Sequence, residues 1–507
     1  MSASNSPDPA ESVPDYIATL EREKPIDADS VTTDGLPTAR SAAKRGYWIF
    51  LTILMLILFE QVAMGYALYV PVLGKLAENF HTAQIGWVIT AWTLAGALLT
   101  PLFGKLADKY GKKRLLLVAL GVTAVGALTA TYAPTFEIFL AGRVIMAGAL
   151  PVSVVQAALM RDIFPKKYLS IAYGVTFTGA GILSTSAPFI AGWLNDTFGY
   201  HAISLFLCGF AIISSLIVFF LVPESKVRVH TKLDIPGLIL LAVGGAAITF
   251  AFGQASTWSW TSPLTWGVLG GGAIVLAVFF VYERARRANH PLVEFELLKS
   301  RGMIVLMIAG GFVQVLASLF TVLNFTLLQM PPGKDGVGFG VSTGTAALYT
   351  FAGSVLAFTG GLSAGVIGRK TGFRPLLVTA CLIVAVTGVF LAFAHHHVWQ
   401  IIIASILSGL GAGIVGGVWN MAQVENIPVH QQGAASGTIG LMTGIGTSVW
   451  AQLLFAVMLL TGVTYHAGAP VYNNGSFVVG FLFAAAIAVA GALATFLLPR
   501  HKPILAT

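Results

Sequence analysis

The chain contains fourteen stretches of about 20 residues that are almost free of charged side chains, and they recur from residue 47 to residue 498. A stretch of this length forms a helix that crosses the apolar core of a bilayer, which is about 30 Å thick. Only 10% of all residues are charged and 56% are hydrophobic, whereas roughly one quarter of the residues of a soluble domain are charged. The sequence therefore predicts an all-α integral membrane protein.

Short polar connections separate the apolar stretches and set the boundaries of the expected helices. Because lipid offers the backbone no hydrogen-bond partner, each stretch must satisfy its own polar groups as a helix. We expect the transmembrane helices at 47–69, 84–104, 115–133, 137–159, 169–193, 202–222, 235–254, 264–282, 303–328, 341–367, 375–394, 399–423, 435–461 and 477–498.

Residues 1–46 differ from the rest of the chain in composition. They hold eight acidic and five basic side chains with scattered Pro, Ser and Asp and no apolar block. Such a segment cannot bury enough surface to fold, and it lacks the apolar core of a cleaved signal peptide. We expect a disordered cytoplasmic tail.

The basic residues predict the orientation of the helices. If the tail is cytoplasmic, 26 of the 29 Lys and Arg residues lie on the cytoplasmic side, where such residues are retained. Both termini are therefore expected in the cytoplasm, and the host membrane is expected to be a plasma membrane, such as a bacterial inner membrane. Basic loops that face anionic lipid account for the net charge of +8 without nucleic acid.

Two short patterns occur twice. "GKLADKYGKKR" (104–114) matches "GVIGRKTGFR" (365–374) at an offset of 261 residues, and "TGAG" (178–181) matches "TGIG" (443–446) at an offset of 265. Similar offsets indicate two homologous bundles of six helices with two inserted helices between them. The expected domains are the tail 1–46, an N-terminal bundle 47–222, an inserted pair 235–282 and a C-terminal bundle 303–498.

The stretch 104–114 resembles the G-x-L-a-D-r-x-G-r-k signature of the major facilitator superfamily. "RVIMAG" (143–148) is similar to that family's R-x-x-x-x-G, and "QQGAASG" (431–437) resembles the entry to its penultimate helix in the fourteen-helix branch. Residues 283–301 also resemble that branch, the drug:proton antiporters. The resemblance covers the chain from residue 47 and implies two bundles that rock about a central cavity, driven by a proton gradient.

The antiporter signature G-P-x-x-G-G appears as "APFIAG" (187–192), with alanine in two glycine positions. Its small residues predict close packing of the fifth helix against the neighbouring bundle. The first helix of the branch usually carries an Asp, whereas the acid here is Glu60.

Glu60 lies deep in an apolar stretch, where an ionised carboxylate costs about 2.5 to 3.5 kcal/mol even on lenient insertion scales. Counting residues from the helix ends in a core of about 30 Å places Arg143 at the same level. We therefore expect Glu60 to pair with Arg143 and to load and release a proton during transport. A permanent ion pair that only joins the two helices, and a carboxylate that binds a cationic substrate, are the alternatives.

Charged residues at the cytoplasmic ends of the helices predict a conformational latch, because charges there interact with helix ends and across the seam between bundles. The alternative is that the basic residues only set topology, which leaves the acid unexplained. The expected members of the latch are Gly104, Asp108, Gly111, Lys112, Lys113 and Arg114.

Polar side chains inside two of the expected helices are candidates for the substrate cavity: Gln61 in 47–69, and Gln314 and Asn324 in 303–328. A hydrogen-bonded packing role is equally open for the last two. "GAGIVG" (411–416) matches a dinucleotide-binding pattern but follows no strand, so we expect it to serve helix packing. No nucleotide-binding P-loop is found, three adjacent His side chains (395–397) do not converge on a metal, and no cofactor is expected.

We therefore expect a proton-coupled transporter, not an enzyme, that exports amphipathic, drug-like small molecules as a monomer. A cavity with one acid and much apolar lining suits hydrophobic cations better than sugars or phosphates, which need several polar ligands. The alternatives are a dedicated transporter of a metabolite or lipid, in either direction, and a membrane receptor or scaffold that transports nothing. Substrate-dependent proton flux in vesicles separates the last from the others.

The charge asymmetry makes a prediction about topology. A reporter that is active only in the cytoplasm should be active when it is fused after Thr507 and inactive when it is inserted near Asn474. Reporter activity measured in whole cells checks this, and the reverse pattern would contradict the expected orientation.

Overall fold

The computed structural model describes residues 45–179, 181–228, 234–285, 301–332, 337–426, 432–466 and 469–498. Within these ranges almost all residues lie in helices, which confirms the predicted all-α membrane fold. The predicted tail lies outside the described residues except for Arg45 and Gly46, which begin the first helix.

The helices follow one another along the chain, and one two-stranded hairpin joins the last two. The elements of the first part are α2 (Arg45–Ala67), η2 (Val70–Val72), α3 (Leu73–Phe80), α4 (Trp87–Tyr110), α5 (Lys112–Thr131), α6 (Phe136–Met146), η3 (Ala147–Ala149), α7 (Leu150–Ile163), α8 (Lys166–Gly179), α9 (Gly181–Phe198) and α10 (His201–Leu221). They are followed by α11 (Ile235–Trp258), α12 (Pro263–Ala285), α13 (Arg301–Val313), α14 (Leu316–Gln329), α15 (Thr343–Thr371), α16 (Phe373–Phe393), α17 (Val398–Asn426), α18 (Gln432–Leu459), β1 (Val463–His466), β2 (Ala469–Tyr472) and α19 (Asn474–Phe496).

Thirteen helical segments in the described ranges are long and apolar enough to cross a membrane. The fourteenth predicted helix, 169–193, corresponds to α8 and α9, and residue 180 between them lies outside the described residues. The first predicted helix, 47–69, agrees with α2 (Arg45–Ala67), and the apolar helical segment continues through η2 and α3 to Phe80. Pro71 starts the short helix η2 inside this segment, and α3 then packs Leu73, Leu76 and Ala77 into the core.

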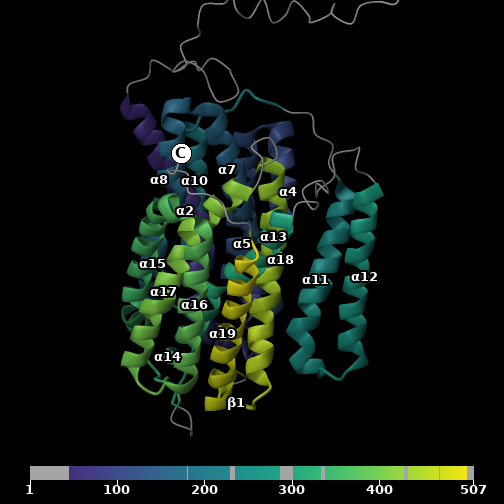
Figure 1. Cartoon of the computed structure of the whole chain (residues 1–507), viewed down its shortest axis with the longest axis vertical. Helices are drawn as coiled ribbons and strands as arrows, with labels where there is room; N and C mark the ends of the chain where they lie inside the picture. The colour runs from purple at the N-terminus through teal and green to yellow at the C-terminus, as the bar shows by residue number, and fades with distance from the viewer. Residues whose placement is uncertain are drawn as a thin grey trace, which may run out of the picture.

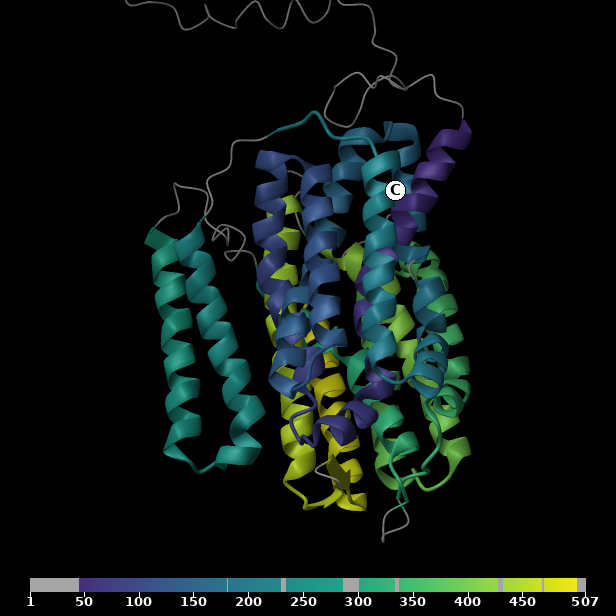
Figure 2. The same ribbon diagram turned by 180° about the vertical axis from the view of Figure 1, so that it is seen from behind.

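The start of α2 and the end of α19 point to the same side of the molecule, and the β1–β2 hairpin lies at the opposite side (Figure 1). We call these the terminal side and the distal side. The helices form three groups, which we call the N-terminal helices (α2–α10), the inserted hairpin (α11–α12) and the C-terminal helices (α13–α19). The inserted hairpin stands at one side of the other two groups in both views (Figures 1 and 2), and α11 contacts α4 and α18.

The two connections that carry the repeated pattern have the same backbone conformation. Gly111 between α4 and α5 has a φ of +113°, and Gly372 between α15 and α16 has a φ of +82°. Each ends one helix and begins the next, in a region of backbone conformation that side chains other than glycine rarely adopt. The two glycines therefore make equivalent sharp turns on the terminal side.

The N-terminal and C-terminal helices meet along two pairs, α4 with α18 and α9 with α15. A Cβ atom at Gly192 of α9 would lie 2.8 Å from Cα of Gly344 in α15. Ala187 and Ala191 on the same helix are fully buried. The predicted close packing of this small-residue segment is therefore found in the structure.

Glycines at intervals of four residues bring α17 against α15. A Cβ atom at Gly409, Gly413 or Gly417 would lie 2.1 Å from a backbone oxygen of α15. Such a row lets two helix backbones approach closely, which favours helix association in lipid. The segment 411–416 thus serves helix packing, as predicted, although a Cβ atom at Gly416 itself would have nothing within 4 Å.

This packing predicts different effects for two matched substitutions in α17. Gly413→Ala should lower the free energy of unfolding by about 1 to 3 kcal/mol, because the added methyl group meets the Ala357 carbonyl of α15. Gly416→Ala adds the same group where nothing is near and should keep or slightly raise stability. Thermal unfolding of the purified proteins measures both, and equal stability of the two variants would contradict the packing argument.

Candidate functional site

Arg143 lies on α6 and is fully buried inside the N-terminal helices. Its Nε donates to the Val88 carbonyl of α4 at 3.0 Å, and its Nη2 donates to the Gly65 carbonyl of α2 at 3.1 Å. The guanidinium carbon lies 3.9 Å from the ring centre of Tyr69 and 5.5 Å from that of Trp92. The cation therefore joins three helices through carbonyl oxygens and aromatic faces, which attract positive charge.

The structure does not bring Arg143 and Glu60 together as an ion pair. The segment that contains Arg143 extends over 28 residues, from Phe136 to Ile163, and is longer than a core of about 30 Å requires. Counted from the terminal ends of their helices, Arg143 lies roughly 30 Å and Glu60 roughly 22 Å along the axis, at about 1.5 Å per residue. Arg143 consequently contacts the backbone at Gly65, more than one turn beyond Glu60.

Glu60 and Gln61 are each only 1% exposed, in the middle of α2. In the part of the chain that the structure describes, neither amide atom of Gln61 has a hydrogen-bond partner. Gly65 follows one turn later on the same face of α2, and the ring of Trp92 lies against it. Buried polar groups normally have partners, so an unpaired amide beside a buried carboxyl is typical of a site that binds something.

Aromatic side chains that no sequence motif marks surround this region. The ring centres of Tyr66 and Trp92 are 6.5 Å apart. The hydroxyl of Tyr69 lies 2.6 Å from Oγ of Ser204, which fixes the ring beneath Arg143. The chain contains 33 Phe, 13 Tyr and 10 Trp residues, and nothing in their spacing distinguishes these three.

The two candidates from the C-terminal helices have different surroundings. Asn324 is 3% exposed, and its Nδ2 donates to Oγ of Ser405 in α17 at 3.2 Å. A hydrogen bond between helices is what we expect if Asn324 has a packing role and does not line the substrate cavity. Gln314 is exposed and lies at the break between α13 and α14.

A buried ion cluster lies at the terminal ends of α4, α5 and α7. Lys112 is fully buried, and its ammonium binds the carboxylate of Asp162 and lies 3.6 Å from Oδ1 of Asp108. The hydroxyl of Ser225, in the segment after α10, donates to Asp162. No sequence motif identifies Asp162. The one signal in the sequence is that it is an acidic residue next to Arg161, near the end of a predicted helix on the side rich in Lys and Arg.

The segment after α10 also covers the Gly111 turn. A Cβ atom at Gly111 would lie 2.6 Å from the guanidinium of Arg228 and 3.1 Å from the carboxylate of Glu224. Glu224 accepts a hydrogen bond from the backbone of Lys113 at 3.1 Å, and Lys113 Nζ donates to the Phe219 carbonyl at 2.8 Å. The Arg228 and Glu224 side chains can move aside, so it is the backbone conformation of Gly111, with a φ of +113°, that favours glycine here.

The other two expected latch residues have fewer neighbours. A Cβ atom at Gly104 would lie 3.8 Å from Val154, an ordinary contact, so its small size is not needed in this arrangement. Arg114 is exposed to the surroundings of the protein. Of the predicted set, the structure brings together Asp108, Gly111, Lys112 and Lys113.

Hydrogen bonds join the N-terminal and C-terminal helices in the distal half of the molecule. Oγ1 of Thr93 and Oγ of Ser448 are 2.9 Å apart between α4 and α18. Between α9 and α15, the backbone of Gly344 donates to Asp196 at 3.3 Å. The amide of Gln329 on α14 donates to the Pro71 carbonyl. These contacts close the distal side of the seam between the two groups.

His395 is the one residue of the His triplet that turns inward, and it is 1% exposed. Its Nδ1 lies 2.7 Å from the Leu391 carbonyl and its Nε2 lies 2.8 Å from Oδ1 of Asn474. Burial lowers the pKa of His395 below its ordinary value, and the two hydrogen bonds oppose this shift. No group of three or more metal-binding side chains occurs within the described residues.

Comparison with known proteins identifies the fold and the family. A model of the Major Facilitator Superfamily matches residues 55–451. Among solved structures, a transporter of the POT family in complex with 5-aminolevulinic acid superimposes with a TM-score of 0.62 at 13% identity, over 92% of this chain and 97% of that one.

The relatives include two named as transporters and one named as a multidrug resistance protein. The "Probable actinorhodin transporter" of Streptomyces coelicolor is 28% identical, and the alignment covers 73% of this chain but only 65% of that protein, less than two thirds of its length. The "Uridine/deoxyuridine transporter" of Lactococcus lactis is 25% identical over 82% of this chain and 88% of the relative. The "Multidrug resistance protein Stp" of Mycobacterium tuberculosis is 23% identical over 79% and 76%.

The family match extends from α2 to α18 and includes the Gly111 turn, the Arg143 site and the seam between the two groups of helices. The fold, the apolar helices and the family agree with one another. The chain therefore belongs to the Major Facilitator Superfamily and is a multi-pass membrane transporter, not an enzyme.

Proposed function

We propose that this transporter exports amphipathic, drug-like small molecules in exchange for protons. The observation that carries the proposal is the burial of the Glu60 carboxyl, which is 1% exposed in the middle of α2 and adjoins Gln61, whose amide has no partner in the described part of the chain. A carboxyl in such a place is functional by default, because its burial is otherwise costly. It binds a proton when the site is closed to water and releases it when water enters.

Alternating access follows from the arrangement of the contacts between helix groups. The distal side of the seam is closed by hydrogen bonds and by close contacts such as Gly192 with Gly344. Transport to the distal side requires these contacts to separate, while the terminal side closes. In the proposed cycle the bundles 47–222 and 303–498 move as units, and the inserted helices 235–282 accompany them.

The proposed substrate class rests on the lining near Glu60. Tyr66 and Trp92 offer aromatic surface near Glu60, and the Arg143 guanidinium lies 5.5 Å from the Trp92 ring, so this region suits an amphipathic, largely apolar molecule better than a sugar or a phosphate. The multidrug resistance protein and the actinorhodin transporter among the relatives support a drug-like substrate. Growth of a pump-deficient host that expresses the protein, measured against a panel of toxic compounds, tests this class directly.

The second candidate is a transporter of one dedicated metabolite or lipid. The relative that transports uridine and deoxyuridine favours it, since 82% of this chain aligns with that protein. Resistance to several unrelated compounds would support the drug exporter, and uptake or efflux of a single metabolite would support this alternative. We place the protein in the plasma membrane as a monomer with both termini in the cytoplasm.

The proton-carrier proposal predicts the effect of Glu60→Gln. The amide keeps the shape of the protonated acid but releases no proton, so export against a concentration gradient should fall to the background of the empty vesicles. Exchange down a gradient should persist, because rocking needs only the neutral form. Uphill and downhill flux of a substrate found in the growth screen, measured in proteoliposomes and normalised to folded protein, separate the two.

The stability of Glu60→Gln must be measured as well, because a misfolded variant would also lose transport. Arg143 binds the carbonyls of Gly65 and Val88, so its contacts should survive the loss of the Glu60 charge. Yield and thermal stability of Glu60→Gln are therefore expected to match the wild type. A loss of stability in step with transport would favour a structural ion pair instead, and unchanged uphill transport would exclude Glu60 as the proton carrier.

The ion cluster around Lys112 is the proposed conformational latch, and it predicts two different results. Asp162→Asn leaves a fully buried ammonium without its closest charge and should destabilise the protein by about 3 to 5 kcal/mol. Asp108 is 35% exposed and 3.6 Å from the ammonium, so Asp108→Asn should alter stability by less than about 1 kcal/mol but slow transport. Thermal unfolding and turnover of both variants check this.

A paired substitution provides the control for the latch. Lys112→Met combined with Asp162→Leu removes both buried charges and should recover much of the stability lost in Asp162→Asn. Transport should remain impaired in the double variant, since the charges are then absent from the moving side. Wild-type turnover of Asp108→Asn would reduce the cluster to a structural and topological role.

A further inference from the structure

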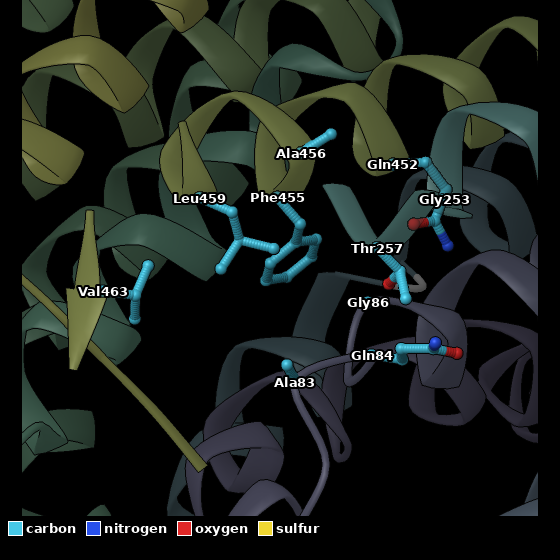
Figure 3. A pocket seen from close by; sticks show the side chains of 10 residues that line it. All are labelled: Ala83, Gln84, Gly86, Gly253, Thr257, Gln452, Phe455, Ala456, Leu459 and Val463. Carbon is cyan, nitrogen blue, oxygen red and sulfur yellow. The ribbon is translucent and has the colours of Figure 1, made fainter. Parts of the chain in front are cut away.

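A cavity of about 250 Å³ lies on the distal side, at a distance from Glu60, where α4 begins and where α11 and α18 end (Figure 3). Its volume is slightly below the range of about 300 to 1,000 Å³ that is typical of sites for drug-sized ligands. The lining comes from all three helix groups and consists of Ala83, Gln84, Gly86, Gly253, Thr257, Gln452, Phe455, Ala456, Leu459 and Val463.

The lining is polar at one end and apolar at the other. Gln84, Thr257 and Gln452 lie toward one end of the cavity, whereas Phe455, Leu459 and Val463 lie toward the other (Figure 3). None of the lining residues is charged. An ion would therefore lose its hydration without gaining a counter-charge, and the cavity favours a neutral molecule with a polar and an apolar part.

Gln452 supplies an unused hydrogen-bond donor. It is 3% exposed, and its Nε2 has no partner within the described residues. Figure 3 shows its side chain pointing from α18 toward Thr257 and Gln84. Gln84 itself is satisfied, because its amide exchanges two hydrogen bonds with Gln254 of α11 at 3.1 and 3.2 Å. A buried donor without a partner is costly, so a ligand with an acceptor oxygen gains from binding here.

The position of the cavity couples binding to the state of the transporter. A Cβ atom at Gly86 of α4 would lie 2.5 Å from the ring of Phe455 in α18, so the two helices are in direct contact beside the cavity. Thr93 and Ser448 join the same two helices by a hydrogen bond of 2.9 Å. These helices must separate if the distal side opens, which would take the cavity apart. A ligand that binds only the assembled cavity stabilises the closed form.

We propose that this cavity is an accessory binding site for a neutral amphipathic molecule whose carbonyl or ether oxygen accepts a hydrogen bond from Gln452. The apolar part of the ligand lies against Phe455 and Leu459. Occupation holds the ends of α4 and α18 together and so restrains opening toward the distal side. The site is separate from the proposed substrate site, and its test does not depend on transport.

The binding test uses 1-octanoylglycerol, which has an ester carbonyl and a short apolar chain, with the full chain in phosphatidylcholine nanodiscs. Gln452→Leu removes the donor at similar volume and should weaken binding about tenfold, the loss of one hydrogen bond to a buried donor. Ala456→Trp fills the cavity and should abolish binding. Leu460→Trp adds the same ring at a position that is 61% exposed and should bind like the wild type.

The outcomes decide the proposal in either direction. Equal affinity in the wild type, Gln452→Leu and Ala456→Trp would overturn the site, and so would tighter binding of the zwitterionic octanoyl-lysophosphatidylcholine than of the neutral probe. Size-exclusion profiles show whether Ala456→Trp is folded. If that variant is not folded, the comparison of Gln452→Leu with the wild type still tests the site. The affinity is measured without transport. A preparation that shows no transport in proteoliposomes can therefore still support or overturn the proposed binding site.

A cross-linking test measures the restraint on opening. Thr93→Cys with Ser448→Cys places two thiols where the hydroxyl oxygens are 2.9 Å apart, in a background in which the buried Cys208 and Cys381 are replaced by alanine. The probe should raise the rate of disulfide formation at least severalfold, and adding Gln452→Leu should remove the increase. An unchanged rate at saturating probe would show that occupation does not hold the distal side closed.

Discussion

A bilayer core offers no hydrogen-bond partners, and this lack governs how the chain folds. Every backbone amide in the membrane must pair within its own segment, so the apolar stretches become helices and their connections lie at the two sides. The same lack makes each buried polar side chain conspicuous. Arg143 is satisfied by the carbonyls of Gly65 and Val88 and by aromatic rings, and Lys112 by two carboxylates. Where a buried polar group has no partner, as at Gln61 and Gln452, a bound molecule is the natural explanation.

Helix association in lipid depends on close packing, because the hydrophobic effect does not favour one apolar surface over another there. Glycine rows meet this need within the C-terminal helices, where α15 and α17 approach backbone to backbone. Between the N-terminal and C-terminal helices, glycines allow such close approach only at single positions, such as Gly192 against Gly344, and a few hydrogen bonds accompany them. Tight packing inside each group and sparse polar contacts between groups suit a molecule whose halves move against each other.

The two candidate sites use this architecture differently. Glu60 and Gln61 are buried within α2, where we propose that the carboxyl holds a proton away from water. The distal cavity lies where three groups meet, so its shape depends on their relative positions. In our proposals a ligand at the first site takes part in transport, whereas a ligand at the second acts only on the equilibrium between conformations. On the terminal side, the Lys112 cluster joins the Gly111 turn to the segment that leads into the inserted hairpin.

The sequence by itself determined the membrane class, the helices, the repeated turn and the place of Glu60 inside an apolar helix, because apolar length and glycine position are local properties. The pairing of side chains depended on the tertiary structure. Counting residues in a core of fixed thickness places Arg143 opposite Glu60, but the segment Phe136–Ile163 that contains Arg143 is longer than that core, and the guanidinium binds the Gly65 carbonyl instead. Asp162 and Gln452 acquire their roles only when distant helices meet, since one becomes the partner of a buried lysine and the other faces a cavity built from three segments. No spacing along the chain records such contacts, because packing alone decides which faces of the helices meet.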